Sequence, residues 1–147
     1  MCIRDSQYIA SVTKPGRAKI KVSAEGFPST PYEFRVKRIP DPIARLGNKQ
    51  GGLIGNGEFK VYDGLDAYLK DFEFEADCKI SGFLLTRHKK NDDPISFKNP
   101  GAKYNSQSAR LVDQAKSGDH YYFDDILAKC PGDERGRKLP SIVFKIK

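Results

Sequence analysis

The sequence lacks long apolar runs and has few cysteines, and each shortage excludes a class of protein. Its longest apolar stretches are short, such as GFLL at residues 82–85 and SIVF at 141–144, whereas a helix that spans a bilayer needs about 20 apolar residues. Three cysteines without a CxxC pair exclude a disulfide scaffold and the usual zinc motifs. The chain also lacks a secretion signal, which would combine a basic region with an apolar run.

The composition is that of a globular protein with an excess of basic over acidic residues. The 147 residues, 38% hydrophobic and 31% charged, suffice for one domain with a core, or for one domain and a piece of another. The net charge of +7 attracts nucleic acid or an acidic surface. However, the basic residues alternate with apolar ones along separate predicted strands, and no aromatic-and-basic nucleic-acid motif is present. We therefore expect no nucleic-acid partner, while an acidic protein would fit an outward cationic face.

Alternation with a period of two residues predicts that most of the chain is β. In RAKIKVS, residues 17–23, Ala18, Ile20 and Val22 are expected to face a core while the cations face water. In DFEFEADCKISGFLLTR, residues 71–87, apolar residues alternate with carboxylates, which predicts a half-buried strand with solvated acids. Further strands are predicted at residues 32–39, 58–62, 120–129 and 140–147.

A single segment favours a helix. SARLVDQAKS at residues 108–117 has one apolar face, which is formed by Leu111, Val112 and Ala115. Gly118 is suited to the C-terminal stop of this helix. Short strands, turns between them and one helix together predict a mainly β fold, a β-sandwich-like domain with one short helix.

Two prolines mark a boundary along the chain. Pro40 and Pro42 lack a backbone N–H and push the residues before them into an extended conformation, so residues 35–47 are expected to form a stiff connector. Only two convincing strands precede it, and two strands do not make a core of their own. We therefore expect residues 7–33 to be the remnant of a preceding β domain and residues 34–147 to form the main domain.

The glycine cluster GGLIGNGE, residues 51–58, does not predict a cofactor site. A dinucleotide site requires glycines that open a helix, whereas a strand is predicted to follow here. The glycines instead favour a hairpin turn at Asn56 and Gly57.

The two histidines do not identify a catalytic or metal site. His88 lies among cations that favour its neutral form, as expected of a surface residue at a strand end. His120 is close in sequence to Asp119, Asp124 and Asp125. Along a strand, however, Asp125 points away from the face that His120 and Asp124 share. We therefore expect no metal, no cofactor and no catalytic residue, and we do not expect an enzyme.

Cys78 and Cys130 leave two interpretations open. In an oxidising compartment they would form a disulfide that closes a loop of about 50 residues. Otherwise they are two separate buried thiols.

Three long segments resemble one known family, in the family's own order. They are similar to the C-terminal domain of the gliding-motility proteins GldM/PorM. The segments are FRVKRIPDPIARLG at residues 34–47, DGLDAYLKDFEFEADCKISGF at 63–83 and SGDHYYFDDILAKCPGDERGRKLPSIVFKIK at 117–147. Residues 8–26 similarly resemble the last strands of the periplasmic domain before it.

The resemblance implies a mechanical role without catalysis. GldM/PorM proteins belong to the Bacteroidota type IX secretion and gliding machinery, in which a membrane helix near their N-terminus pairs with GldL/PorL to form a proton-driven motor. Their periplasmic part is a homodimer of successive domains, and the last domain reaches an outer-membrane-associated ring of GldK/PorK and GldN/PorN. The chain would be this distal periplasmic domain without its membrane anchor. The resemblance does not identify the residues that contact the ring.

Two other functions compete with this one. An extracellular protein- or glycan-binding β-sandwich module would present an aromatic platform, for which Tyr104, Tyr121 and Tyr122 are the candidates. A hydrolase would gather His120 and nearby acids with a second polar cluster in a cleft.

The opening residues 1–6, MCIRDS, resemble a translated sequencing adapter fused to a gene fragment. This interpretation sets Cys2 apart from the other two cysteines and leaves the net charge unchanged, because Arg4 and Asp5 cancel. We expect residues 1–6 to pack against nothing specific, and a targeting segment and membrane anchor to be missing from this copy. Residues 7–23 would then offer an unpaired strand edge.

Overall fold

The structure is a computed structural model that describes residues 7–147. The described chain divides between Ile39 and Pro40 into two compact units. From sequence we begin the main domain at residue 34, whereas in the structure the first unit extends to Ile39. The adapter interpretation of residues 1–6 lies outside the described residues.

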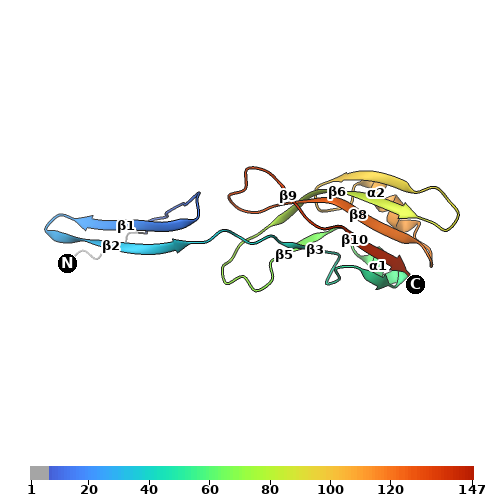
Figure 1. Cartoon of the computed structure of the whole chain (residues 1–147), viewed down its shortest axis with the longest axis horizontal. Helices are drawn as coiled ribbons and strands as arrows, with labels where there is room; N and C mark the ends of the chain where they lie inside the picture. The colour runs from blue at the N-terminus through green and yellow to red at the C-terminus, as the bar shows by residue number, and fades with distance from the viewer. Residues whose placement is uncertain (1–6) are drawn as a thin grey trace. The chain divides into compact units, whose positions relative to one another are not determined.

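The first unit is a hairpin of two antiparallel strands, β1 (Gly16–Ala24) and β2 (Phe27–Val36) (Figure 1). The strand predicted at residues 17–23 is confirmed. Strand β2 begins earlier than we predicted and includes Pro28 and Pro31. Proline is tolerated there because a two-stranded ribbon consists only of edge strands, whose outer N–H groups need no partner.

The hairpin has one apolar face and one cationic face, because residues directly opposite in an antiparallel pair point to the same side. Ile20 pairs with Tyr32 on the apolar face, and Arg17 pairs with Arg35 on the cationic face. The predicted burial of the apolar face is wrong: Val22 is 55% exposed and Tyr32 is 51% exposed. A second layer would be needed to bury them, and a lone hairpin supplies none.

The second unit is built on a six-stranded mixed sheet in the order β4–β10–β8–β6–β7, with the short β9 paired to β8. Only the β4–β10 pair is parallel among these strands. The predicted strands at residues 120–129 and 140–147 are confirmed. The strands are β4 (Gly52–Ile54), β6 (Lys79–His88), β7 (Ile95–Pro100), β8 (His120–Lys129), β9 (Arg137–Lys138) and β10 (Ile142–Ile146).

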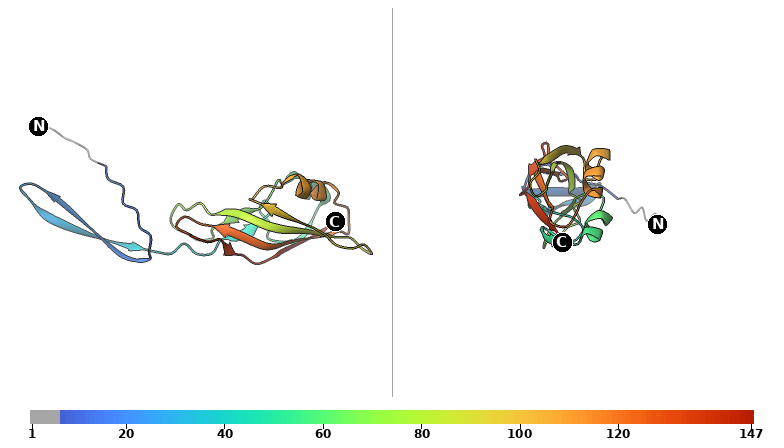
Figure 2. Two further views of the ribbon diagram at one scale, coloured as in Figure 1. Left: turned by 90° about the horizontal axis from the view of Figure 1, so that it is seen from above. Right: turned by 90° about the vertical axis from the view of Figure 1, so that its right-hand side faces the viewer.

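Two helices lie on one side of this sheet, α1 (Asn56–Val61) and α2 (Ser106–Asp113), as the right-hand view of Figure 2 shows. A small antiparallel sheet of β3 (Ile43–Arg45) and β5 (Asp66–Tyr68) adds Ala44 to the same core. The mainly β prediction is confirmed, with two short helices instead of one.

The core lies between the helices and the inward side chains of the central strands. Phe59 of α1 is fully buried, and its ring centroid lies 4.6 Å from that of Tyr121 and 6.2 Å from that of Phe144. The ring centroid of Phe123 lies 5.5 Å from that of Phe83 across the β6–β8 pair. This aromatic cluster fixes which face of each strand is buried.

The strand predicted at residues 58–62 is wrong, because this segment belongs to helix α1. Helical geometry buries Phe59 and leaves Val61 78% exposed, whereas a strand would have placed both on one face. The predicted hairpin turn at Asn56 and Gly57 is also wrong, since both lie in the first turn of α1. The glycine cluster therefore does precede a helix, although one of only six residues.

The strand predicted at residues 71–87 is confirmed only from Lys79 onward, where β6 begins. Residues 71–78 form no regular structure, and Phe74 is 57% exposed. The reason lies in the partner strand: Lys79 pairs with Lys129, the last residue of β8, so no strand is left to pair with the preceding residues. Alternating polarity alone does not sustain a strand without a neighbour.

Helix α2 starts two residues before the predicted helix and ends at Asp113. Asn105 supplies its N-cap, because the side-chain Oδ1 accepts a hydrogen bond of 2.9 Å from the backbone N–H of Ser108. The buried Asn99 accepts a bond of 2.7 Å from the backbone N–H of Asn105 and so holds the cap in place. Leu111 and Val112 are buried, as the apolar face predicts.

Candidate functional site

A disulfide joins the two long central strands at one end. Cys78 precedes β6 and Cys130 follows β8, and the pairing of Lys79 with Lys129 brings the two cysteines together. Their sulfur atoms are bonded at 2.03 Å and both residues are buried. The bond covalently fixes the register of the strand pair at this end.

A buried ion pair fixes the other end of the same strands. The Nη2 and Nε atoms of Arg87, in β6, donate to Oδ2 of Asp119 at 2.7 and 2.9 Å. The two side chains are only 2% and 9% exposed. Arg87 also donates to the side chain and carbonyl of Gln114, and the backbone N–H of Lys116 donates to Asp119. Each charge is thus compensated and hydrogen-bonded, as burial requires.

We missed this ion pair from sequence, although the alternation of β6 carries a signal for it. Phe83 and Leu85 point to the core, and the same period of two places Arg87 on the inward side. A cation at an inward position implies a buried partner, because an unpaired buried charge is too costly.

The two histidines pair with each other across the strands, and two of the three acids considered above have cationic partners elsewhere. His88 ends β6, as predicted for a strand-end residue, and lies directly opposite His120 at the start of β8. Asp119 is held by Arg87, and Asp125 forms a salt bridge of 3.1 Å with Lys138. Within residues 7–147, no group of three or more His, Cys, Asp or Glu side chains is arranged to hold a metal ion.

The three candidate tyrosines do not form an aromatic platform. Tyr121 is fully buried and donates its hydroxyl hydrogen bond to the carbonyl of Leu111, whereas its neighbour Tyr122 faces the opposite side of the sheet. Tyr104 stacks on Phe123 with ring centroids 6.5 Å apart. Burial raises the pKa of both Tyr104 and Tyr121 above the usual tyrosine value. The arrangement therefore gives no support to a glycan-binding function.

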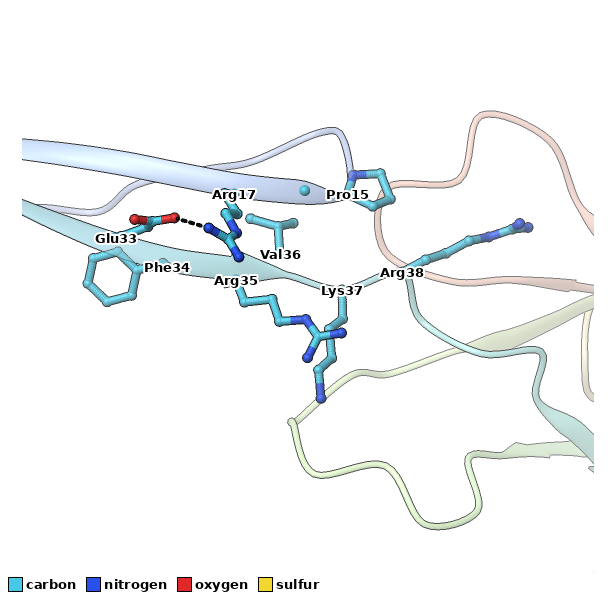
Figure 3. Close-up of a pocket in the computed structure, with 9 residues that line it drawn as sticks. Pro15, Arg17, Glu33, Phe34, Arg35, Val36, Lys37 and Arg38 are labelled. Atoms are coloured by element: carbon cyan, nitrogen blue, oxygen red, sulfur yellow. Dashed lines mark hydrogen bonds and ion pairs between the residues drawn. The ribbon is translucent and has the colours of Figure 1, made fainter.

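An open, cationic hollow lies on the hairpin (Figure 3). Arg17 and Arg35 contribute to its lining, and Arg17 forms a salt bridge of 3.2 Å with Glu33. Both side chains of this pair are substantially exposed, so the bridge contributes little to stability. Phe34 and Val36 add apolar surface to the lining. Such a surface suits contact with another macromolecule better than chemistry on a small substrate.

Comparison with known protein families identifies a family for the second unit. The model of the GldM C-terminal domain matches residues 40–147. The chain belongs to the GldM family. No curated protein sequence matches the chain significantly. Because the match begins at Pro40, it covers the whole of the second unit and leaves the hairpin outside.

Membership of the GldM family makes the chain a component of the gliding-motility and type IX secretion machinery. The family is periplasmic, and its members are structural proteins and not known enzymes. The Cys78–Cys130 disulfide is consistent with an extracytoplasmic domain. Among the described residues, no helix has the length and apolar character to cross a membrane.

Proposed function

We propose that the chain is a non-catalytic coupling module of the type IX secretion and gliding machinery. It would link an inner-membrane motor to the outer-membrane-associated ring of GldK/PorK and GldN/PorN. The observation that carries the proposal is the match of the GldM C-terminal domain to the whole second unit. The partner GldL/PorL would be contacted by another part of the protein, and the working form would be a homodimer.

The construction of the second unit supports a role in transmitting force. Strands β6 and β8 pair along most of their length, and cross-links lie at both ends of the pair. Cys78–Cys130 is covalent, and Arg87–Asp119 is a buried, multiply hydrogen-bonded ion pair. Because these backbone hydrogen bonds and both cross-links act together, pulling the pair apart requires many bonds to break at once.

The proposal places the domain in the periplasm, as part of an inner-membrane protein whose anchor lies elsewhere in the protein. The disulfide supports this location, because such bonds persist in the oxidising periplasm and are rare in the cytosol.

We further propose that residues 7–33 belong to a preceding periplasmic β domain, separate from the GldM C-terminal domain. The exposed apolar side chains of the hairpin support this, since Phe27 is 74% exposed and Tyr32 is 51% exposed. Additional strands of such a domain would cover these side chains.

Binding to the ring proteins tests the proposed function. The purified, oxidised full chain is immobilised, and GldK and GldN from the same organism are passed over it, with a surface without the chain as control. Retention of the ring proteins is expected. If the dimeric chain retains neither ring protein, a coupling role for this domain is refuted.

A further inference from the structure

The side of the six-stranded sheet away from the helices has a surface whose composition is not explained by folding. In β6 the inward Phe83 and Leu85 are buried, so the alternating Leu84 and Thr86 point to the other side. Both helices lie on the inward side (Figure 2). We call the opposite side the outer sheet face.

Cross-strand register shows which residues of the other strands share this face. Leu84 lies opposite Lys98 of β7, and Lys145 of β10 lies between Leu53 of β4 and His120 of β8. Residues that pair directly across a sheet point to the same side. The outer sheet face therefore gathers residues from every strand of the sheet.

Five exposed lysines occupy the outer sheet face, one from each of five strands. Among the residues described, only Lys138 of the five has a salt-bridge partner, Asp125 of β8 at 3.1 Å. Asp124 lies on this face as well, because a β-bulge with a positive φ at Asp125 interrupts the alternation of β8; the expectation that Asp125 points away from the face of Asp124 is therefore wrong. Among the strand residues of this face, five lysines thus stand against two carboxylates, and positive charge prevails. The five are Lys79, Lys98, Lys129, Lys138 and Lys145.

One pair of these lysines is arranged against the stability of the isolated domain. Lys79 and Lys129 lie directly opposite each other on neighbouring strands. Like charges in that position repel and destabilise a sheet. Carboxylates of an acidic partner would offset this repulsion. The arrangement is therefore explained by binding, whereas it does not stabilise the isolated fold.

Apolar side chains lie among the lysines. Leu53 is 59% exposed, and Leu127 and Val143 are each 40% exposed. Leu53 pairs with Lys145, and Leu127 pairs with Lys138. Apolar contacts flanked by charges are typical of protein interfaces with an apolar centre and a polar rim. The phosphate backbone of a nucleic acid has no apolar surface to pack against these side chains, and the carboxylate of Asp124 would repel it.

We infer that the outer sheet face docks an acidic protein surface, and that this surface is how the domain engages the ring. The inference rests on the proposed function, which it extends from a partner to a contact face. The partner surface would carry carboxylates opposite Lys98, Lys129 and Lys145, and an apolar patch opposite Leu53 and Val143.

Charge reversal on two faces of the same unit tests the inference. The variant K98E/K145E changes the outer sheet face. The control K60E/K116E makes the same change in net charge at exposed lysines of α1 and of the segment after α2. Binding of each full-length variant to purified GldK and GldN is measured at low and high salt, and its thermal unfolding is recorded. If K98E/K145E unfolds early, K98Q/K145Q replaces it.

The expected result is a dissociation constant at least about tenfold larger for K98E/K145E, and within about twofold of the unmodified chain for the control. The affinity of the unmodified chain should also fall at high salt, which screens exposed charges. Equal binding by both variants would overturn the inference while leaving the proposed function intact. Failure of the unmodified chain to bind would instead remove the proposed function. If these lysines bind duplex DNA or anionic vesicles and the chain does not bind the ring proteins, the inference of an acidic protein partner is also overturned.

Discussion

Reduction of the Cys78–Cys130 disulfide is expected to lower the stability of the domain substantially. The cysteines are 52 residues apart in sequence, and the bond restricts that loop in the unfolded chain. In the chain-entropy description, a loop of this length corresponds to about 4 kcal/mol of unfolding free energy. For a unit of this size, that loss lowers the melting temperature by roughly 15 °C.

The assay compares urea unfolding of the oxidised chain, the chemically reduced chain and the variant Cys78→Ser/Cys130→Ser. The variant Cys2→Ser is the matched control and should behave like the unmodified chain, because Cys2 takes no part in the bond. Thiol titration of the denatured, oxidised chain should find only the thiol of Cys2. A stability loss below about 1 kcal/mol, or three free thiols in protein from the periplasm, would refute the reasoning.

Three further predictions concern individual side chains. Arg87→Ala leaves Asp119 buried without its partner, so urea unfolding should show a loss of about 3–5 kcal/mol in unfolding free energy. The control Arg45→Ala removes a more exposed pair with Asp66 and should cost less than about 1 kcal/mol. Equal losses in the two variants would contradict the burial assigned to Arg87 and Asp119. Asn105→Ala removes the N-cap of α2 and should cost about 1 kcal/mol by the same assay, and no change would contradict the cap. Burial raises the pKa of Tyr104 and Tyr121 in the folded state, so unfolding free energy should fall as pH rises above the usual tyrosine pKa of about 10. Tyr121→Phe should make that fall less steep, and an unchanged pH profile would contradict the burial effect.

Prediction from sequence succeeded where a strand has neighbours on both sides or a strong inward pattern. Residues 120–129 and 140–147 are rich in apolar residues and lie within the sheet, so local composition and tertiary pairing agree, although a bulge at Asp124 and Asp125 interrupts the alternation of β8. Residues 71–78 alternate more regularly but have no partner, because β8 ends at Lys129. The pattern of a single segment does not reveal where its neighbour stops.

Short segments were harder to predict because tertiary contacts decide them. Residues 58–62 are compatible with a strand, but burial of Phe59 against Tyr121 and Phe144 selects a helical turn. The contact between Arg87 and Asp119 joins residues 32 apart. The lysines of the outer sheet face come from five strands. The strand order and the pairing register show that they share one face, which the pattern of a single segment does not reveal.

The central claim is that this domain couples to the outer-membrane-associated ring, and binding of the purified, oxidised chain to GldK and GldN tests it most directly. Titration of the ring proteins into the chain, followed by calorimetry, should give saturable binding that weakens as salt increases. Absence of heat and of complex at every ring-protein concentration, with a correctly folded and disulfide-bonded chain, would contradict the account.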